Sequence, residues 1–205
     1  MNRQHAGFTL IEISIVLVII GLLLGGVLKG QELIENAKLK RMNNDFSGIA
    51  TGAYSYLDRY AAIPGDDSDA KTRWTIDSNP TSPDGALGDG VLDGAWNVAT
   101  TETGYFWDHL RRSNLITGGQ GTKMPVHAFA GKIGVADGYL ALTGPVICMD
   151  NINGKRAEII DKQLDDGQPG TGVLRAEAAN NPAGTVVVTG TSYDLAETYA
   201  LCKQM

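Results

Sequence analysis

The sequence predicts an α+β protein in which one long N-terminal helix precedes a globular part built from short strands, turns and helices. Residues 13–28 are apolar apart from Ser14 and three glycines, and residues 29–60 contain no proline. Later in the chain, short apolar runs alternate with turns rich in Gly, Asp and Pro, which is typical of strands. The ample apolar content and the charged fraction of 20% exclude a disordered chain.

The first part of the predicted helix, residues 8–28, is long enough and apolar enough to span a bilayer. Its one charged side chain is Glu12. A charge inside hydrocarbon costs several kcal/mol unless it is paired. The sequence therefore predicts a functional role for Glu12 and a positively charged partner.

The second part, residues 29–61, is predicted to be amphipathic. Its apolar side chains recur every three or four residues and form one stripe: Leu39, Met42, Phe46, Ile49, Ala53, Leu57 and Tyr60. Pro64 pushes Ile63 out of the helical region, so we expect the helix to end near residue 61. One face of this part should pack on the globular head, residues 62–205.

The chain begins with a short basic leader, residues 1–7, followed by Phe8-Thr9-Leu10-Ile11-Glu12. Gly7 to Glu12 resembles the cleavage and methylation motif of type IV prepilins and of the related type II secretion pseudopilins. The resemblance implies that a prepilin peptidase cuts between Gly7 and Phe8 and methylates the new amine of Phe8. It also implies that Glu12 pairs with the positive N-terminus of a neighbouring subunit during filament assembly.

The resemblance further implies a pilin-like fold, in which the C-terminal half of the helix packs on an antiparallel sheet, with a variable loop region at residues 64–104. The implied function is structural: a homopolymer in a helical surface filament that serves adhesion, motility or DNA uptake. The subunit would wait in the inner membrane with a periplasmic head until a pilus or type II secretion assembly platform polymerises it into an extracellular pilus.

Three other interpretations stay open. A type II secretion pseudopilin shares the same N-terminus, and Lys29 stands where many type IVa pilins have a kinking proline. A membrane-anchored periplasmic binding module would need the helix but not the motif. An ordinary signal peptide is disfavoured, since no small-x-small cleavage site follows Leu28 and since such peptides lack an acid like Glu12.

The two cysteines, Cys148 and Cys202, are predicted to form a disulfide, because an exported head lies in an oxidising compartment and because pilins commonly carry one in this region. The loop it closes would contribute roughly 4 kcal/mol by the chain-entropy relation. The alternative is a pair of buried free thiols.

Aspartates and histidines in the head are the other candidate site residues. Asp84, Asp89 and Asp93 are candidate calcium ligands in a glycine-rich segment, although aspartates there also cap their own turns. Asp165-Asp166 fits a helix-ending turn better than a calcium site. No zinc pattern surrounds His109 or His127, and the nucleophile, zinc-protease and phosphate-binding motifs of enzymes are missing, so we expect no enzyme and no other cofactor. The net charge of −6 disfavours non-specific nucleic-acid binding.

Within the head, the patterns predict two helices and five strands. The helices are expected at residues 103–113 and 155–164. The strands are expected at residues 133–135, 139–142, 146–149, 173–176 and 185–189. The tryptophans, Trp74, Trp96 and Trp107, are expected in the core, with a ligand-binding surface as the alternative.

Overall fold

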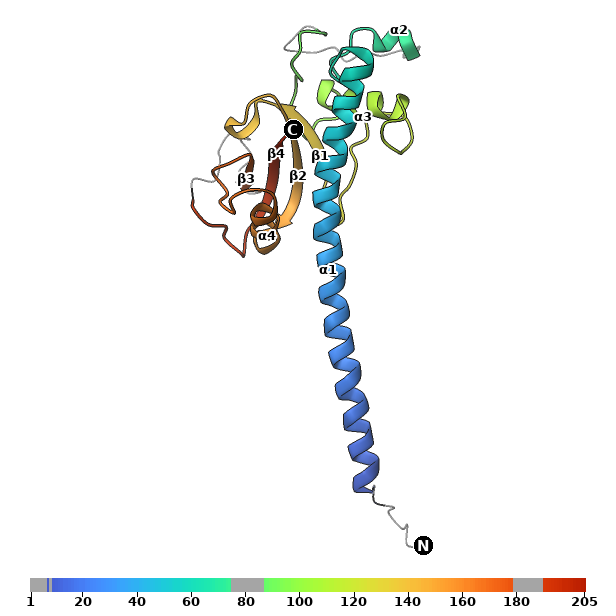
Figure 1. The fold of residues 1–205 in the computed structure, drawn as a ribbon, viewed down its shortest axis with the longest axis vertical. Coiled ribbons are helices and arrows are strands. Elements are labelled where there is room, and N and C mark those ends of the chain that lie inside the picture. Colours follow the sequence, from blue (N-terminus) through green and yellow to red (C-terminus); the bar gives the residue numbers. More distant parts are fainter. Residues whose placement is uncertain (1–6, 8, 75–86, 179–189) are drawn as a thin grey trace. The chain divides into compact units, whose positions relative to one another are not determined.

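The computed structural model describes residues 7, 9–74, 87–178 and 190–205. The chain divides into two compact units, residues 1–40 and residues 41–205, and the boundary falls inside helix α1. Helix α1 (Leu10–Tyr60) is 51 residues long (Figure 1). The unit that begins at Arg41 contains the last part of α1 and all the other elements.

Helix α1 ends as the sequence predicts. Ala61 takes a left-handed backbone with φ of 54°, and its N–H still donates to the carbonyl of Leu57. Pro64 follows closely, so no further helical turn can form. The absence of proline from Lys29 to Tyr60 allows the hydrogen-bond ladder to continue unbroken up to this point.

The second unit is built around a four-stranded antiparallel sheet in the order β1-β2-β4-β3 (Figure 1). The strands are β1 (Ile133–Asp137), β2 (Pro145–Asn153), β3 (Leu174–Ala178) and β4 (Thr198–Gln204). A long N-terminal helix followed by a small antiparallel sheet is a pilin-like α+β layout, so the predicted fold class is confirmed.

Three helices and a 3₁₀ turn complete this unit: α2 (Ala70–Trp74), α3 (Glu102–Arg112), the turn η1 (Tyr139–Ala141) and α4 (Gly154–Leu164). Helices α3 and α4 lie within one residue of their predicted positions. The side chain of Asn153 caps α4 by accepting from the N–H of Lys155. Helix α2 was not predicted, because the Pro64–Ser68 turn signals obscured its single turn.

The strand prediction at residues 139–142 is wrong. Tyr139–Ala141 form η1, in which Leu140 and Ala141 have φ of 53° and 57°, and Leu142 follows the turn. Leu140 and Leu142 are buried there, so their apolar character serves the core and not a strand ladder. The strand expected at residues 185–189 lies outside the described residues, and β4 was not predicted.

The core of the second unit includes a stripe from the last part of α1: Met42, Phe46, Ile49, Ala53 and Tyr56. The prediction that Leu57 belongs to it is wrong, because Leu57 is 42% exposed while Tyr56 is fully buried. The Tyr56 hydroxyl donates to Asp67 Oδ2 at 2.6 Å, which satisfies its polar end inside the core. Trp96 and Trp107 are buried as well, as expected of core tryptophans, whereas Trp74 is only partly buried.

Candidate functional site

Gly7 lies just before α1, is exposed, and has open space around it. Among the described residues, no atom lies within 4 Å of a Cβ added at this position. These residues therefore place no steric demand for glycine at position 7. Phe8 lies outside the described residues.

Thr9 and Glu12 form a reciprocal capping box at the start of α1. The Thr9 N–H and hydroxyl both donate to Glu12 Oε2, at 2.8 Å and 2.7 Å, and the Glu12 N–H donates to Thr9 Oγ1 at 3.3 Å. Three polar groups at an apolar helix terminus are thus satisfied within one turn. The spacing of a threonine three residues before a glutamate is a sequence signal of this motif, so the capping box could have been predicted.

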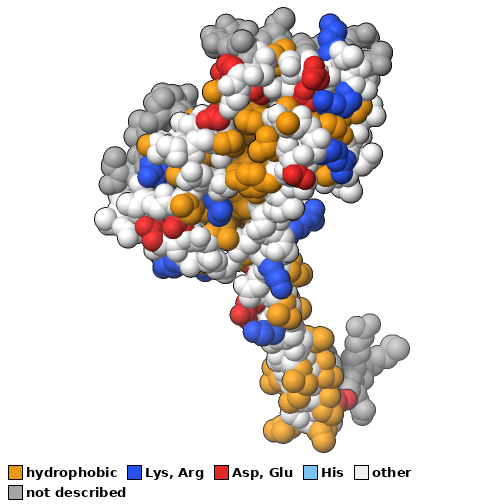
Figure 2. Space-filling view, turned by 45° about the horizontal axis from the view of Figure 1, so that its top comes forward, with side chains coloured by type: hydrophobic (Ala, Val, Ile, Leu, Met, Phe, Trp, Pro, Cys, Tyr) orange, Lys and Arg blue, Asp and Glu red, His pale blue; other side chains and the backbone are white. Residues whose placement is uncertain are grey.

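The turns of α1 that follow expose apolar side chains all around the helix. Every large hydrophobic residue from Leu10 to Leu28 is at least 46% exposed, and Figure 2 shows hydrophobic side chains covering the visible face of this segment. Its mean hydropathy reaches 2.7 in an 18-residue window, which is enough for a helix to cross a membrane, a test that a signal sequence also passes. A Lys29–Glu32 ion pair at 2.8 Å begins the polar part.

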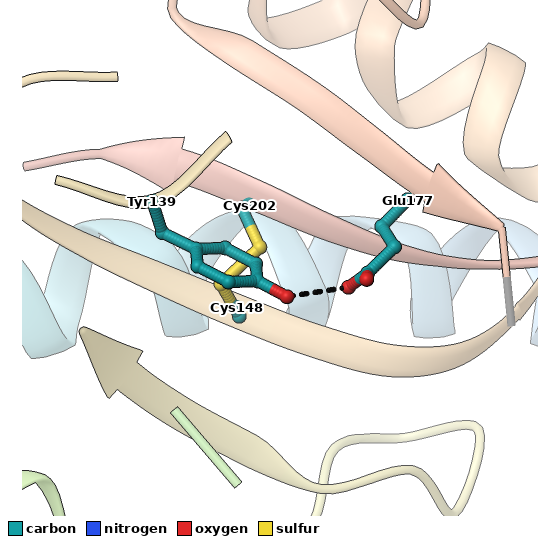
Figure 3. The surroundings of a disulfide bond; sticks show 4 residues. All are labelled: Tyr139, Cys148, Glu177 and Cys202. Atoms are coloured by element: carbon teal, nitrogen blue, oxygen red, sulfur yellow. Dashed lines mark hydrogen bonds between the residues drawn. A yellow bond between two sulfur atoms is a disulfide. The ribbon is translucent and has the colours of Figure 1, made fainter. Parts of the chain in front are cut away.

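Cys148 of β2 and Cys202 of β4 are joined by a disulfide. Both are fully buried and directly opposite each other in the sheet register. Figure 3 shows the Tyr139 ring beside the bond, with the hydroxyl donating to Glu177 Oε2 at 2.7 Å. Burial raises the pKa of Tyr139, so the phenol stays neutral and keeps donating to Glu177. The disulfide is therefore a buried structural bond enclosed by polar and apolar neighbours.

The segment Gly88–Gly94, called here the 88–94 loop, carries Asp89 and Asp93, two of the candidate calcium ligands. Asp84 lies outside the described residues. Asp89 Oδ1 accepts from the N–H of Val91 at 3.0 Å, as in a turn that caps itself. The Asp93 N–H donates to the buried Glu102 at 2.9 Å. Desolvation raises the pKa of Glu102 to about 7.

His109 of α3 is fully buried and stacks on Tyr56, with ring centroids 6.0 Å apart. Its Nδ1 accepts from the N–H of Gly65 at 2.9 Å, so the neutral tautomer carries its proton on Nε2. Burial lowers the pKa of His109 to about 4. The Nε2 of His127 lies 2.7 Å from the carbonyl oxygen of Asp150, which is also a structural contact.

Comparison with known families finds one match in the N-terminal segment. Residues 2–28 match the family described as the prokaryotic N-terminal methylation motif. The chain carries this prepilin signature. Comparison with curated proteins and with solved structures finds no match for the chain.

The prepilin signature includes Gly7, Glu12 and the apolar helix, which the structure places in one continuous segment. It is the signature of type IV pilins and their relatives, a class of structural subunits that prepilin peptidase processes and that assemble into a pilus or pseudopilus. Together with the apolar start of α1 it fits anchoring in a membrane. Glu102, whose buried Oε1 has no hydrogen-bond partner, was not predicted, because no local motif marks an acid that the fold buries.

Proposed function

We propose that the chain is a type IV pilin-like structural subunit that polymerises through α1 into a surface filament. A prepilin peptidase would cut between Gly7 and Phe8 and methylate the new amine. The observation that carries the proposal is the match of residues 2–28 to the methylation motif, at the start of an uninterrupted helix.

The apolar surface of α1 supports polymerisation. Side chains exposed on all sides of a helix need hydrocarbon or other protein around them, because contiguous apolar surface in water is unfavourable. A bilayer meets this need before assembly, and the α1 helices of neighbouring subunits meet it afterwards. The same segment can therefore serve both as the membrane anchor and as the packing core of a filament.

Glu12 gives the filament its register in this proposal. Thr9 satisfies one carboxylate oxygen of Glu12 but brings no positive charge. The amine created by cleavage at Phe8 would supply that charge from a neighbouring subunit. A subunit docked out of register would leave the carboxylate unpaired in a low dielectric, which costs several kcal/mol.

Mass spectrometry of the N-terminus in sheared and membrane fractions tests the proposal. We expect an N-methylated Phe8 in an extracellular filament fraction, and the unprocessed chain in a Gly7→Ser strain. The Glu12→Ala chain should be processed but should fail to enter filaments. Glu32→Ala is the matched control, because Glu32 lies on the same helix, is exposed and already pairs with Lys29.

Three outcomes would revise the proposal. A mature chain found only in membranes would favour a type II secretion pseudopilin. An unprocessed Met1 terminus in cells with an active prepilin peptidase would leave a membrane-anchored binding module. Incorporation of Glu12→Ala at the level of Glu32→Ala would remove the role assigned to Glu12.

A further inference from the structure

The loop that joins β1 to β2, residues 138–144, packs on the sheet face that carries the disulfide. It contains the turn η1 and is called here the 138–144 flap. Gly138 and Gly144 lie at its two ends with φ of 61° and 70°, and the N–H of Gly138 donates to the carbonyl of Gly144 at 3.0 Å. The two ends of the flap therefore meet at glycines, which adopt such torsions without strain.

The flap covers the bond between Cys148 and Cys202, both of which are 0% exposed. Three flap residues belong to the cysteine cluster or pack against it: Tyr139, Leu140 and Leu142. Figure 3 shows the Tyr139 ring beside the two sulfur atoms. The other members of the cluster come from the strands, apart from Trp96. Within the described part of the chain, the cover over the bond therefore comes from the flap and Trp96.

Polar side chains of the sheet hold the flap in place. The Tyr139 hydroxyl donates to Glu177 Oε2 at 2.7 Å, and Arg175 Nη1 donates to the carbonyl of Leu140 at 3.0 Å. Gln204 of β4 donates to a carbonyl near the far end of the flap at 2.8 Å. None of these contacts belongs to the strand ladders. Each contributes little net free energy in water, so the flap can lift while the sheet stays paired.

We propose that the disulfide is a redox site closed by the 138–144 flap, and that lifting of the flap, without unfolding of the sheet, admits a dithiol reductant. A thiolate of the reductant would form a bond to one Sγ, while the Sγ–Sγ bond breaks and the other cysteine leaves as a thiolate. The second thiol of the reductant would then displace the first cysteine. Two electrons and two protons pass to the protein, and the reductant ends as a disulfide.

This site is independent of the filament role, because the flap and the bond both lie within the unit of residues 41–205. Tyr139 is the side chain on which closure depends most, since its ring packs at the bond and its hydroxyl is anchored to the buried Glu177. Tyr139→Phe removes the anchor alone, and Tyr139→Ala removes the anchor and the ring. The two variants should therefore open the flap to different extents.

Reduction of the folded full chain by dithiothreitol in detergent micelles tests the flap. Samples taken over time would be quenched with iodoacetamide, and mass spectrometry would count the alkylated cysteines. We expect reduction about fivefold faster in Tyr139→Phe, the factor that one hydrogen bond is worth, and more than about tenfold faster in Tyr139→Ala. Tyr54→Phe is the matched control, because Tyr54 is 55% exposed on α1, and its rate should equal that of wild type.

Phe46→Ala separates lifting of the flap from unfolding of the head. Phe46 is buried, but it lies outside the cysteine cluster, so this variant weakens the fold and leaves the flap contacts in place. Its rate of reduction should stay within about twofold of wild type if opening is local. If the sheet must unfold first, Phe46→Ala should be reduced much faster than wild type.

Three results would overturn the proposal: wild-type rates in both Tyr139 variants, an acceleration in Phe46→Ala as large as in Tyr139→Ala, or a wild-type bond that is reduced only after urea unfolds the chain. Circular dichroism before reduction checks that each variant is folded. If Tyr139→Ala does not fold, Glu177→Ala takes its place. It removes the same anchor, so we expect the rate of Tyr139→Phe, and a wild-type rate would contradict the proposal.

Discussion

Thr9 is the residue that decides how the Glu12 carboxylate is held in the single chain. Thr9→Val keeps the side-chain shape but removes the hydroxyl that donates to Oε2 and accepts from the Glu12 N–H. Loss of a cap costs about 1 kcal/mol, so the first turn of α1 should fray. We expect hydrogen exchange of the Glu12 amide in micelles to accelerate about fivefold. Thr9→Ser should keep the wild-type rate, and equal rates in all three chains would refute the capping box.

The buried His109 should make the free energy of unfolding depend on pH. Its pKa is about 4 in the fold against an ordinary value of 6.5, so the unfolded chain binds more protons between these values. Asp67 and Asp108 favour the imidazolium and Arg73 and Arg112 oppose it, but desolvation dominates. The free energy of unfolding should therefore fall as the pH drops from about 6.5 to about 4, by about 3 kcal/mol.

Denaturant unfolding of wild type and His109→Asn across this pH range measures that contribution. The Asn oxygen can accept from the Gly65 N–H in place of Nδ1, and it does not titrate. Other groups contribute equally to both chains, so the difference between the two curves isolates His109. Parallel curves from pH 7 to pH 4 would show that His109 does not contribute.

At the scale of elements, the last part of α1 stabilises the head through its buried face. Phe46 is 2% exposed, whereas Tyr54 on the same helix is 55% exposed. Truncation of a buried phenylalanine removes its burial and leaves a cavity, so Phe46→Ala should lower the free energy of unfolding by about 3–5 kcal/mol. Tyr54→Ala should change it by less than about 0.5 kcal/mol. Urea unfolding followed by far-UV circular dichroism compares the two, and similar losses would contradict this packing.

The elements also show what the sequence could predict. Helix α1 was predictable because its period, its lack of proline and Pro64 all agree. The error at residues 139–142 arose because Leu140 and Leu142 alternate like strand residues, while the left-handed backbone at Leu140 and Ala141 is set by tertiary packing. Strand β4 could have been predicted, since residues 199–202 form a short apolar run between polar ends.

The residues of the candidate site also fall into two groups: those that local sequence identifies and those that only the fold reveals. Gly7, Glu12 and the two cysteines are recognisable from local sequence. Glu102 and His109 become notable only because the fold buries them and leaves a polar atom of each without a partner. No local pattern encodes burial of that kind, since it depends on segments far away in the chain.

At the scale of the whole molecule, the disulfide joins strands that are far apart in sequence. Cys148 and Cys202 are separated by 54 residues. The double variant Cys148→Ser, Cys202→Ser removes the constraint on the unfolded chain and places two hydroxyls in an apolar cluster. The free energy of unfolding should fall by about 2–5 kcal/mol in denaturant titrations. A loss below about 0.5 kcal/mol would mean that the sheet does not depend on the bond.

The chain itself covers part of each outer strand of the sheet. On β1, the N–H of Ile133 donates to Pro125, and Val126 forms an antiparallel bridge with Lys132. On β3, the N–H groups of Leu174 and Ala176 donate to Asp165 Oδ2 and to the carbonyl of Pro169, both at 2.8 Å. Covered edges offer few free backbone groups to a strand of another copy. Assembly by sheet extension is therefore disfavoured, which agrees with the proposal that α1 is the polymerising element.

If α1 drives assembly, a shortened chain that begins at Lys29 should not assemble. It retains residues 41–205, the compact unit that contains the sheet, and loses the apolar turns of α1. We expect it to stay monomeric by light scattering at concentrations where the full chain, transferred out of detergent, assembles or precipitates. The circular dichroism spectrum provides the control for folding. Filaments formed by a folded, shortened chain would show that contacts between heads drive assembly, and α1 would then be only an anchor.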